Sequence, residues 1–310
     1  MTPGSAARRV AAVDMGTNST RLLIADRRET GLVDVERIET VTGLGRGVDR
    51  SARLSPDGIE RTARVLQSYG RRIRQAGVQA ARAVATSAAR DASNRDEFVE
   101  AATRALGFRP DIISGEEEAG LVFAGATGGT RDPGATVVVD IGGGSTEIVT
   151  DEGGVSTDIG SIRLTERCLP NHPATVRDLA AARREAARVM SAADLPRRSY
   201  AMGAAGTWTS LAAMHLRLDS YDSHEVEGTT LGVEDAERMV AWLGSLSLAD
   251  KKAIRSLNPK RAPIILGGAV VAETSLRLLG LKRITVTGHD ILDGVCLSVA
   301  GGQWPVVGGP

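Results

Sequence analysis

The stretch VVVDIGGGSTEIV, residues 137–149, decides the fold of this chain. A hydrophobic run ends in an aspartate, small residues and a Ser-Thr pair follow, and a second strand-like run begins. The stretch AAVDMGTNSTRLLI, residues 11–24, aligns with it without a gap. The aligned positions are Asp14 with Asp140, Gly16 with Gly142, Ser19 with Ser145, and Thr20 with Thr146. The chain therefore contains the same strand–turn–strand unit twice.

The composition is that of an ordinary globular protein. The 310 residues suffice for two domains, and 42% hydrophobic and 25% charged residues are typical of soluble proteins. A formal net charge of zero gives no support to nucleic-acid or membrane-surface binding, and no apolar run approaches a membrane span. Cys168 and Cys296 form no CxxC pair, so we expect a reduced, cytoplasmic protein without structural zinc.

Strand-like and helical patterns alternate along the chain. Residues 55–77 predict an amphipathic helix with Ser55 as N-cap, Pro56 at the first helical position and Gly77 at the end. Residues 81–90 predict a strand that ends in a polar loop, and residues 94–107 a helix capped by Asn94. The pattern predicts an α/β fold with two related domains, residues 1–121 and 122–310, which face each other across an interdomain cleft.

The repeated turn suits phosphate. Glycines and small polar residues let several backbone N–H groups point into one concavity that favours an anion, and the hydroxyl groups add donors. The aspartate repels phosphate, so its natural role is to bind a metal ion that bridges to phosphate, or a water of that ion. One such turn alone would favour plain hairpin chemistry, but the repetition favours two turns that hold a polyanion with Mg²⁺.

Other glycine-loop motifs do not fit the context. A dinucleotide fingerprint opens a helix, whereas IGGGST is followed by the strand-like EIVTD. A P-loop needs a lysine after its glycines, and neither IGGGST nor GAAGTWTS contains one.

Five motifs carry a resemblance to a known family. They are VDMGTNSTRLLIAD, VATSAARDASN, IISGEEEAGLVFAGA, VVDIGGGSTEIV and AMGAAGT, in that order. The paired turns resemble those of the actin, sugar-kinase and Hsp70 ATPase superfamily, whose domains are ribonuclease H-like. The five motifs together resemble the exopolyphosphatase/guanosine pentaphosphate phosphohydrolase (Ppx/GppA) family from about residue 10 to residue 300. The resemblance is to its short members, which lack C-terminal helical domains.

The resemblance implies roles for named residues. Glu118 matches the general base, whereas Glu116 and Glu117 are explained by the favourable placement of acids in a first helical turn. The resemblance also implies that Arg90 contacts phosphate, whereas without it Arg90 would be read as an ordinary surface arginine. The implied phosphate ligands are Asn18, Ser19, Gly143, Gly144, Ser145 and Thr146, and the implied Mg²⁺ ligands, direct or through water, are Asp14, Asp140 and Glu147. Glu147 has the alternative of a strand residue that faces solvent.

Two weaker candidates and one departure remain. The loop at residues 203–207 is either a third phosphate-facing loop or a tight strand-to-helix turn, and Lys260 and Arg261 are candidates for a distal anion contact. The family usually has LREG in its last helix, whereas this chain has ILDG with Leu292 and Asp293. A basic contact with the substrate is therefore missing there.

The expected activity is Mg²⁺-dependent release of orthophosphate from the ends of inorganic polyphosphate, with a preference for short chains. The alternative is hydrolysis of guanosine pentaphosphate to the tetraphosphate, by the same terminal chemistry and with a link to the stringent response. A superfamily kinase, for which Arg21 could meet ATP phosphates, and a non-catalytic nucleotide sensor are the remaining alternatives. The resemblance also implies a homodimer.

Overall fold

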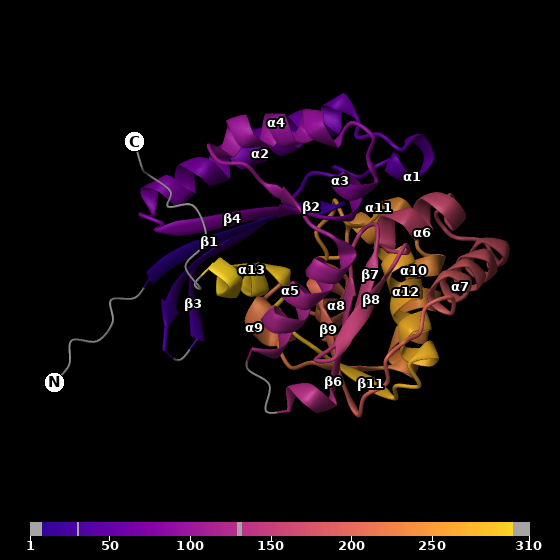
Figure 1. The fold of residues 1–310 in the computed structure, drawn as a ribbon. Coiled ribbons are helices and arrows are strands. Elements are labelled where there is room, and N and C mark those ends of the chain that lie inside the picture. The colour runs from indigo at the N-terminus through magenta and orange to yellow at the C-terminus, as the bar shows by residue number, and fades with distance from the viewer. Residues whose placement is uncertain (1–7, 30, 129–131, 300–310) are drawn as a thin grey trace. The chain divides into compact units, whose positions relative to one another are not determined.

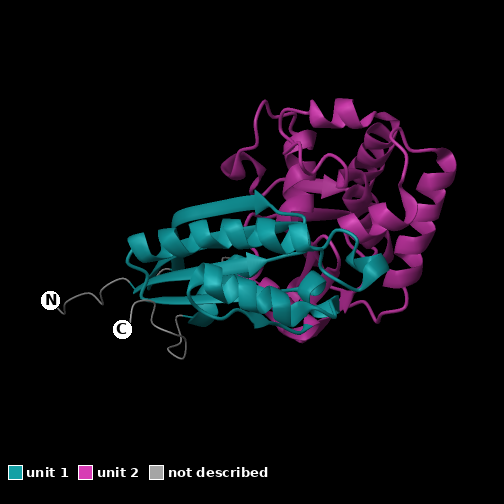
Figure 2. Ribbon diagram, turned by 90° about the horizontal axis from the view of Figure 1, so that it is seen from above, with its two compact units in different colours: residues 1–114, 291–310 teal, residues 115–290 magenta. Residues whose placement is uncertain are grey.

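A computed structural model describes residues 8–29, 31–128 and 132–299 (Figure 1). The chain divides into two compact units. The first contains the residues up to Ser114 together with those from Ile291 onward, and the second contains Gly115–Asp290 (Figure 2). Each unit is a mixed α/β structure with its own sheet and core, which confirms the predicted fold class.

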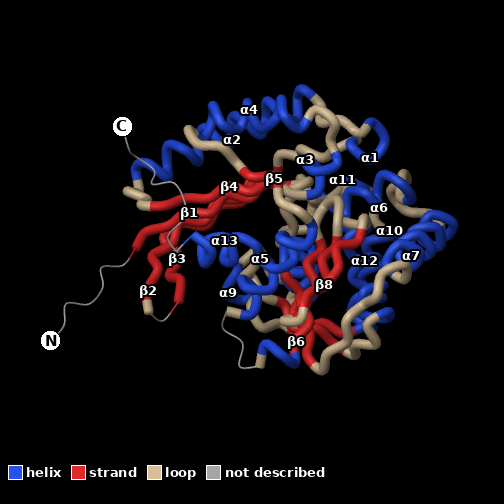
Figure 3. The backbone as a smooth tube through the Cα atoms, in the orientation of Figure 1, coloured by secondary structure: helices blue, strands red, loops and turns tan. Residues whose placement is uncertain are grey.

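The sheet of the first unit has the strand order β3-β2-β1-β4-β5. Its first three strands are antiparallel neighbours, and β4 and β5 continue the sheet in parallel with β1. Helices α2 and α4 cover one face and α13 covers the other (Figure 3). The elements are β1 (Arg8–Met15), β2 (Ser19–Arg28), β3 (Gly31–Val41), α1 (Val48–Ser51), α2 (Pro56–Gln75), β4 (Ala80–Ala85), α3 (Ser87–Asp91), α4 (Arg95–Leu106), β5 (Asp111–Ile112) and α13 (Ile291–Val299).

The sheet of the second unit has the order β10-β11-β9-β6-β7-β8. Helix α5 packs on β7 and β8, and α8 and α12 pack from the other side on β6. The elements are α5 (Gly115–Thr127), the 3-10 helix Pro133–Ala135, β6 (Thr136–Ile141), β7 (Thr146–Thr150), β8 (Gly153–Thr157), α6 (Ser161–Cys168), α7 (Val176–Met190), β9 (Tyr200–Ala204), α8 (Ala205–His215), α9 (Ser223–Val226), β10 (Thr230–Gly232), α10 (Val233–Ser245), α11 (Leu248–Lys252), α12 (Ile265–Leu278) and β11 (Arg283–Val286).

The two sheets repeat one topology. Starting at the edge strand that follows the hairpin, the strand order is β3-β2-β1-β4-β5 in the first sheet and β8-β7-β6-β9-β11 in the second. In each, an antiparallel hairpin carries the turn, and the next strand pairs in parallel with the first strand of the hairpin. The repeat seen in the sequence is therefore a repeat of whole sheets, and the prediction of two related domains is confirmed.

The units do not divide the chain at residues 121 and 122 as predicted. Helix α5 belongs wholly to the second unit because it packs on β7 and β8. Helix α13 returns to the first unit because it packs on β1, β2 and β4. The cleft predicted between the domains stays a prediction.

Local signals predicted α2 better than its neighbours. The Ser55 side chain accepts a hydrogen bond from the Gly58 N–H (3.1 Å), and Gly77 follows the helix with a φ of 66°, so both predicted ends of α2 are confirmed. Asn94 precedes α4, but its side-chain oxygen accepts from the Leu54 N–H (2.9 Å) and its Nδ2 donates to the Leu54 carbonyl (3.1 Å), so it caps no N–H group of the helix. The polar loop expected up to Arg90 is the short helix α3.

Among the described residues, no helix combines the length and the apolar character needed to cross a bilayer.

A bidentate ion pair holds α13 on the first sheet. Arg37 on β3 donates from both terminal nitrogens to the carboxylate of Asp293 (2.8 and 3.1 Å). Asp293 is 5% exposed, so water screens the pair weakly. The side chain that replaces the family's usual glutamate therefore has a structural partner within its own unit, and neighbouring Leu292 is buried in the core.

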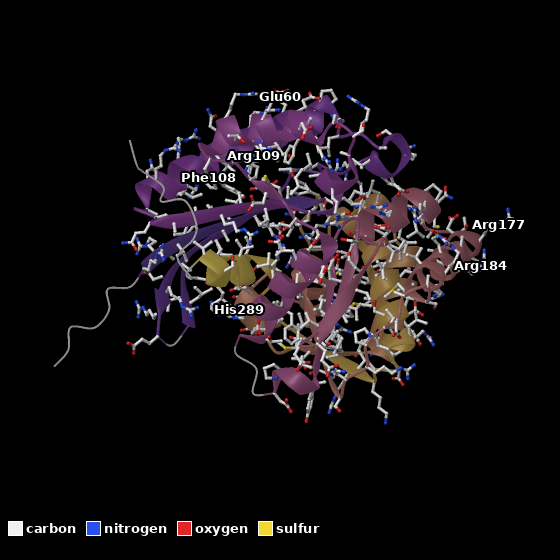
Figure 4. The ribbon with its side chains drawn as sticks, in the orientation of Figure 1. Glu60, Phe108, Arg109, Arg177, Arg184 and His289 are labelled. Atoms are coloured by element: carbon white, nitrogen blue, oxygen red, sulfur yellow. The ribbon has the colours of Figure 1, made fainter. Side chains whose placement is uncertain are left out.

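Asp293→Asn should destabilise the first unit, because Arg37 loses its buried ion-pair partner and keeps the pair with the more exposed Asp34 (Nε to Oδ2, 2.7 Å). We expect a loss of roughly 2 kcal/mol in the free energy of unfolding, measured by urea denaturation. Glu60→Gln is the matched control, since Glu60 pairs with Arg64 on the exposed surface of α2 (Figure 4) and such pairs contribute about 0–1 kcal/mol. Equal losses of unfolding free energy in the two variants would contradict a stabilising role for the buried Arg37–Asp293 pair.

Lys251 on α11 is buried in the second unit. Its Nζ lies 3.0 Å from Nδ1 of His172, and burial lowers the pKa of Lys251 to about 8. Burial and the neighbouring Lys251 also lower the pKa of His172. The unfolded chain therefore binds more protons than the folded chain between about pH 8 and the ordinary lysine pKa of about 10.5, and stability rises with pH across that window.

Lys251→Met should remove this dependence. The free energy of unfolding of the variant, relative to that of the wild type, should be about 2 kcal/mol higher at pH 7 than at pH 10. The reason is that the buried protonated lysine of the wild type is costly only in the folded state. Urea denaturation at the two pH values measures the difference. A pH-independent change would show that the Lys251 ammonium is well solvated.

Candidate active site

The two repeated turns have one backbone geometry. The Gly16 N–H donates to the Ser19 carbonyl (3.0 Å), and the Gly142 N–H donates to the Ser145 carbonyl (3.1 Å). A Cβ at either glycine would lie 3.2 Å from that same carbonyl oxygen, which is tighter than ordinary packing. The alignment of the two sequences thus corresponds to an alignment of hydrogen bonds.

Helix α6 holds the second turn from behind. Its first residues supply donors to three consecutive carbonyl groups of the turn, and Gly160 lies so close that a Cβ there would be 2.6 Å from the Gly143 carbonyl carbon. The donors are the Ser161 N–H and Oγ (2.9 and 3.1 Å to Gly142 O), the Ile162 and Arg163 N–H groups (2.8 and 3.1 Å to Gly143 O) and Arg163 Nε (2.8 Å to Gly144 O).

These contacts decide where the N–H groups of the turn point. In a trans peptide the C=O and N–H bonds project in opposite directions. Because the carbonyls of Gly142, Gly143 and Gly144 point at α6, the N–H groups of Gly143, Gly144 and Ser145 point away from it. Three successive N–H groups on one side form a concavity that binds anions.

The loop after β3 does the same for the first turn. The Thr42 and Gly43 N–H groups donate to the Asn18 carbonyl (3.1 and 2.7 Å), and the Gly45 N–H donates to the Thr17 carbonyl (2.9 Å). The Asn18 side chain is 6% exposed, and within the described part of the chain neither its Nδ2 nor its Oδ1 has a hydrogen-bond partner. A buried amide without partners costs stability, so Asn18 fits the predicted role as a phosphate ligand.

The two turns differ in charge. Asp14 lies opposite Arg21 in the register of β1 and β2, and Arg21 donates to Asp14 Oδ2 from Nε and Nη2 (2.9 and 2.7 Å). Asp140 lies opposite Glu147 in the equivalent register of β6 and β7. The first turn therefore carries a neutralised carboxylate, and the second turn carries two carboxylates side by side.

A third carboxylate, Glu118 of α5, joins the second turn. Glu118, Asp140 and Glu147 are 7%, 5% and 1% exposed. Burial raises the pKa of Glu147 well above its ordinary value, and the charges of Glu118 and Asp140 raise it further. Ser156 Oγ donates to Glu147 (2.7 Å), and Ser145 also hydrogen-bonds it. The alternative of a solvent-facing Glu147 is wrong.

The oxygen ligands of the second turn suit Mg²⁺ in chemistry. Within the described ranges, no three His, Cys, Asp or Glu side chains form a cluster that could hold a metal by themselves. Mg²⁺ usually keeps several waters and takes one or two carboxylates together with substrate phosphate oxygens, so Asp140 and Glu147 fit it without a protein-only cage. Asp14, neutralised by Arg21, fits a contact through water better than a direct one.

The remaining predicted residues have defined places. Arg90, in the last turn of α3, donates from Nη1 to the Ile113 carbonyl (3.1 Å) in the first unit, so it belongs to a different unit from Glu118. Ser19 is buried at the start of β2. The Thr146 hydroxyl donates to the Ile159 carbonyl (2.6 Å), which gives that hydroxyl a structural contact in place of a phosphate one.

Two weaker candidates meet in the structure. A Cβ at Gly206, in the predicted third loop, would lie 2.1 Å from Arg261 Nη2, so the guanidinium rests directly on that backbone. The Thr207 hydroxyl donates to the Ile141 carbonyl (3.0 Å), immediately before the second turn. Nothing in the sequence pairs these residues, because Gly206 and Arg261 are 55 positions apart in the chain and only the fold brings them together.

Comparison with known proteins agrees with this geometry. Residues 10–301 match the model of the Ppx/GppA phosphatase family. Exopolyphosphatase 2 of Mycobacterium tuberculosis is 40% identical over 317 aligned residues, which cover 94% of this chain and 99% of that protein. The crystal structure of an exopolyphosphatase-like protein is 33% identical with a TM-score of 0.90, over 95% of this chain and 98% of that one. The Aquifex aeolicus PPX-GPPA enzyme is 30% identical with a TM-score of 0.79, over 94% and 99%.

The fold and the paired turns define a two-domain protein of the actin-like class. Within that class, the chain belongs to the Ppx/GppA phosphatase family.

The raised pKa of Glu147 predicts a pH-dependent effect of Glu147→Gln in metal-free protein. The folded wild type keeps its proton at pH values where the unfolded chain has lost it, so stability falls as pH rises above about 4.5 toward the folded pKa. The variant should therefore be more stable than the wild type at pH 8 with EDTA, and the difference should shrink at pH 4. Chemical denaturation measures both.

Glu116→Gln is the control, because Glu116 is an exposed acid in the first turn of the same helix that carries Glu118. Its effect should be small at either pH. A Glu147→Gln variant whose stability difference from the wild type is the same at pH 4 and pH 8 would contradict the raised pKa of Glu147.

Proposed function

We propose that this chain is an exopolyphosphatase, which hydrolyses the terminal phosphoanhydride of inorganic polyphosphate and releases orthophosphate. One observation carries the proposal: the Gly143, Gly144 and Ser145 N–H groups form an anion-binding turn, and Ser145 contacts a group of buried carboxylates that includes Glu118. Phosphate binding and water activation are the two tasks of phosphoanhydride hydrolysis, and both belong to one unit. The relatives named exopolyphosphatase support the same substrate class.

Each residue has a task in this reaction. The N–H groups of the second turn bind the oxygens of the terminal phosphate and stabilise the charge that they carry in the transition state. Glu118 accepts a proton from the attacking water, or orients it. Asn18 donates from Nδ2 to a phosphate oxygen at the first turn, and the Arg90 guanidinium neutralises further oxygens.

We propose Mg²⁺ as the metal, held by Asp140 and Glu147 and, through water, by Asp14. When bound, it would neutralise phosphate charge and favour the ionised form of Glu147. The chain's own contribution is the mutual repulsion of Glu118, Asp140 and Glu147, which makes the buried group a place that attracts a cation.

Guanosine pentaphosphate is the second candidate substrate, because its terminal anhydride presents the same chemistry to the same turn. A homodimer and a cytoplasmic location stay proposals as well.

Glu118→Gln should lower kcat for phosphate release by about 100-fold or more, since general base catalysis typically contributes about 10²–10⁴. The measurement is phosphate release with Mg²⁺ and then with EDTA, from tripolyphosphate, long-chain polyphosphate, guanosine pentaphosphate and ATP. Glu116→Gln, on the exposed side of the same helix, should retain wild-type activity.

The substrate ranking tests the rest of the proposal. Higher kcat/KM for tripolyphosphate than for long chains, at equal concentrations of chain ends, would support the preference for short chains. Higher kcat/KM for guanosine pentaphosphate than for either polyphosphate would identify that nucleotide as the preferred substrate. Tight binding of all four compounds without turnover would overturn the proposal that this chain is a hydrolase.

A further inference from the structure

One carbonyl group of the second turn depends on a side chain. The Gly142 and Gly143 carbonyls accept from backbone N–H groups of α6, whereas the Gly144 carbonyl accepts from Arg163 Nε (2.8 Å). Arg163 lies in the first turn of α6, and its backbone N–H also donates to Gly143 (3.1 Å). The guanidinium is therefore anchored to the turn through a short and rigid segment of helix.

The first turn provides a comparison within the same chain. Asn18 is the residue equivalent to Gly144, and its carbonyl accepts from the N–H groups of Thr42 and Gly43 (3.1 and 2.7 Å). A substitution of those two residues leaves their N–H groups in place. In the second turn, the equivalent contact comes from the side chain of Arg163, so a substitution can remove it.

The orientation of the Gly144 carbonyl has a consequence on its other side. The Gly144–Ser145 peptide is trans, so its N–H, which belongs to Ser145, points away from Arg163. Glycine residues adopt many backbone conformations, and the run Gly142–Gly144 has little intrinsic preference for the one observed. Ser145 also hydrogen-bonds Glu147, so rotation of this peptide would disturb the carboxylate group as well.

We propose that Arg163 is a positioning residue for phosphoanhydride hydrolysis. Its guanidinium holds the Gly144 carbonyl so that the Ser145 N–H is oriented in advance toward the phosphate oxygens. It acts through the peptide and not as a ligand of the substrate. This inference rests on the proposed exopolyphosphatase function.

The experiment compares Arg163→Met with Arg163→Lys and a matched control. Arg198→Met is the control, because Arg198 Nε also donates to a backbone carbonyl in the second unit, that of Gly134 (3.0 Å), at a place away from both turns. Arg184→Met controls for charge, because Arg184 projects from the outer face of α7 (Figure 4). The readouts are kcat and KM for tripolyphosphate, the melting temperature, and tripolyphosphate affinity by calorimetry.

Arg163→Met should lower kcat/KM by about 10- to 100-fold, because loss of one oriented donor in a site of this kind has effects of that order or larger. Its melting temperature should fall no further than that of Arg198→Met. Arg163→Lys should recover part of the activity, since an ammonium group can donate to the Gly144 carbonyl. Arg198→Met and Arg184→Met should stay within twofold of the wild type.

Three outcomes would overturn the inference. They are a kcat/KM of Arg163→Met within twofold of the wild type, an equal loss of kcat/KM in Arg198→Met, and an activity of Arg163→Lys as low as that of Arg163→Met at an unchanged melting temperature. If the wild type releases no phosphate from any polyphosphate, the proposed function fails separately. The calorimetric affinity then decides: tenfold weaker tripolyphosphate binding by Arg163→Met than by Arg198→Met supports the positioning role, and equal binding overturns it.

Discussion

The direction of a few peptide planes is the constraint on which both turns depend. A carbonyl that is held on one side of a turn sends the next N–H group to the other side, so each turn needs donors behind it before it can bind an anion in front. The first unit supplies them from the loop after β3, and the second unit supplies them from the start of α6. Each supporting segment has a glycine at its closest approach, Gly45 against Thr17 and Gly160 against Gly143, where a Cβ would lie 2.3 and 2.6 Å from its neighbour.

One backbone geometry thus supports two different electrostatic designs. In the first unit, the cross-strand partner of the aspartate is Arg21, which neutralises the carboxylate through Oδ2, and the buried Asn18 amide has no hydrogen-bond partner among the described residues. In the second unit, the partner is Glu147, and α5 adds Glu118. Because carboxylates repel each other strongly when buried, the second turn attracts a cation far more than the first. The repeated residues give the two turns the same backbone geometry, and the residues that differ between the turns give them different charges.

Local patterns were sufficient to predict the repeated turns, the helix from Pro56 to Gln75, and the buried strands, because each depends on neighbours in the chain. The return of α13 to the first sheet could not be predicted, since its apolar face would suit either sheet and only the distant Arg37 identifies the partner. Asn94 had the residue type and position of an N-cap, but two hydrogen bonds to Leu54 competed with that role. Arg163 was missed for a similar reason. Nothing in the motif IGGGST indicates that its last glycine carbonyl is held by a side chain 19 positions later.

The same contacts bear on the choice between hydrolysis and phosphoryl transfer to an acceptor. A kinase of this superfamily would use the basic residue after the first turn on ATP phosphates, but here two nitrogens of Arg21 donate to Asp14 within the same hairpin. Breaking that pair would be costly, because Asp14 is 3% exposed and removing one partner of a buried ion pair destabilises the other. In the second unit, Glu118 lies close enough to Glu147 to raise its pKa, so the proposed general base stands beside the turn proposed to bind phosphate. A carboxylate in that position needs only water as its partner, and this arrangement favours hydrolysis.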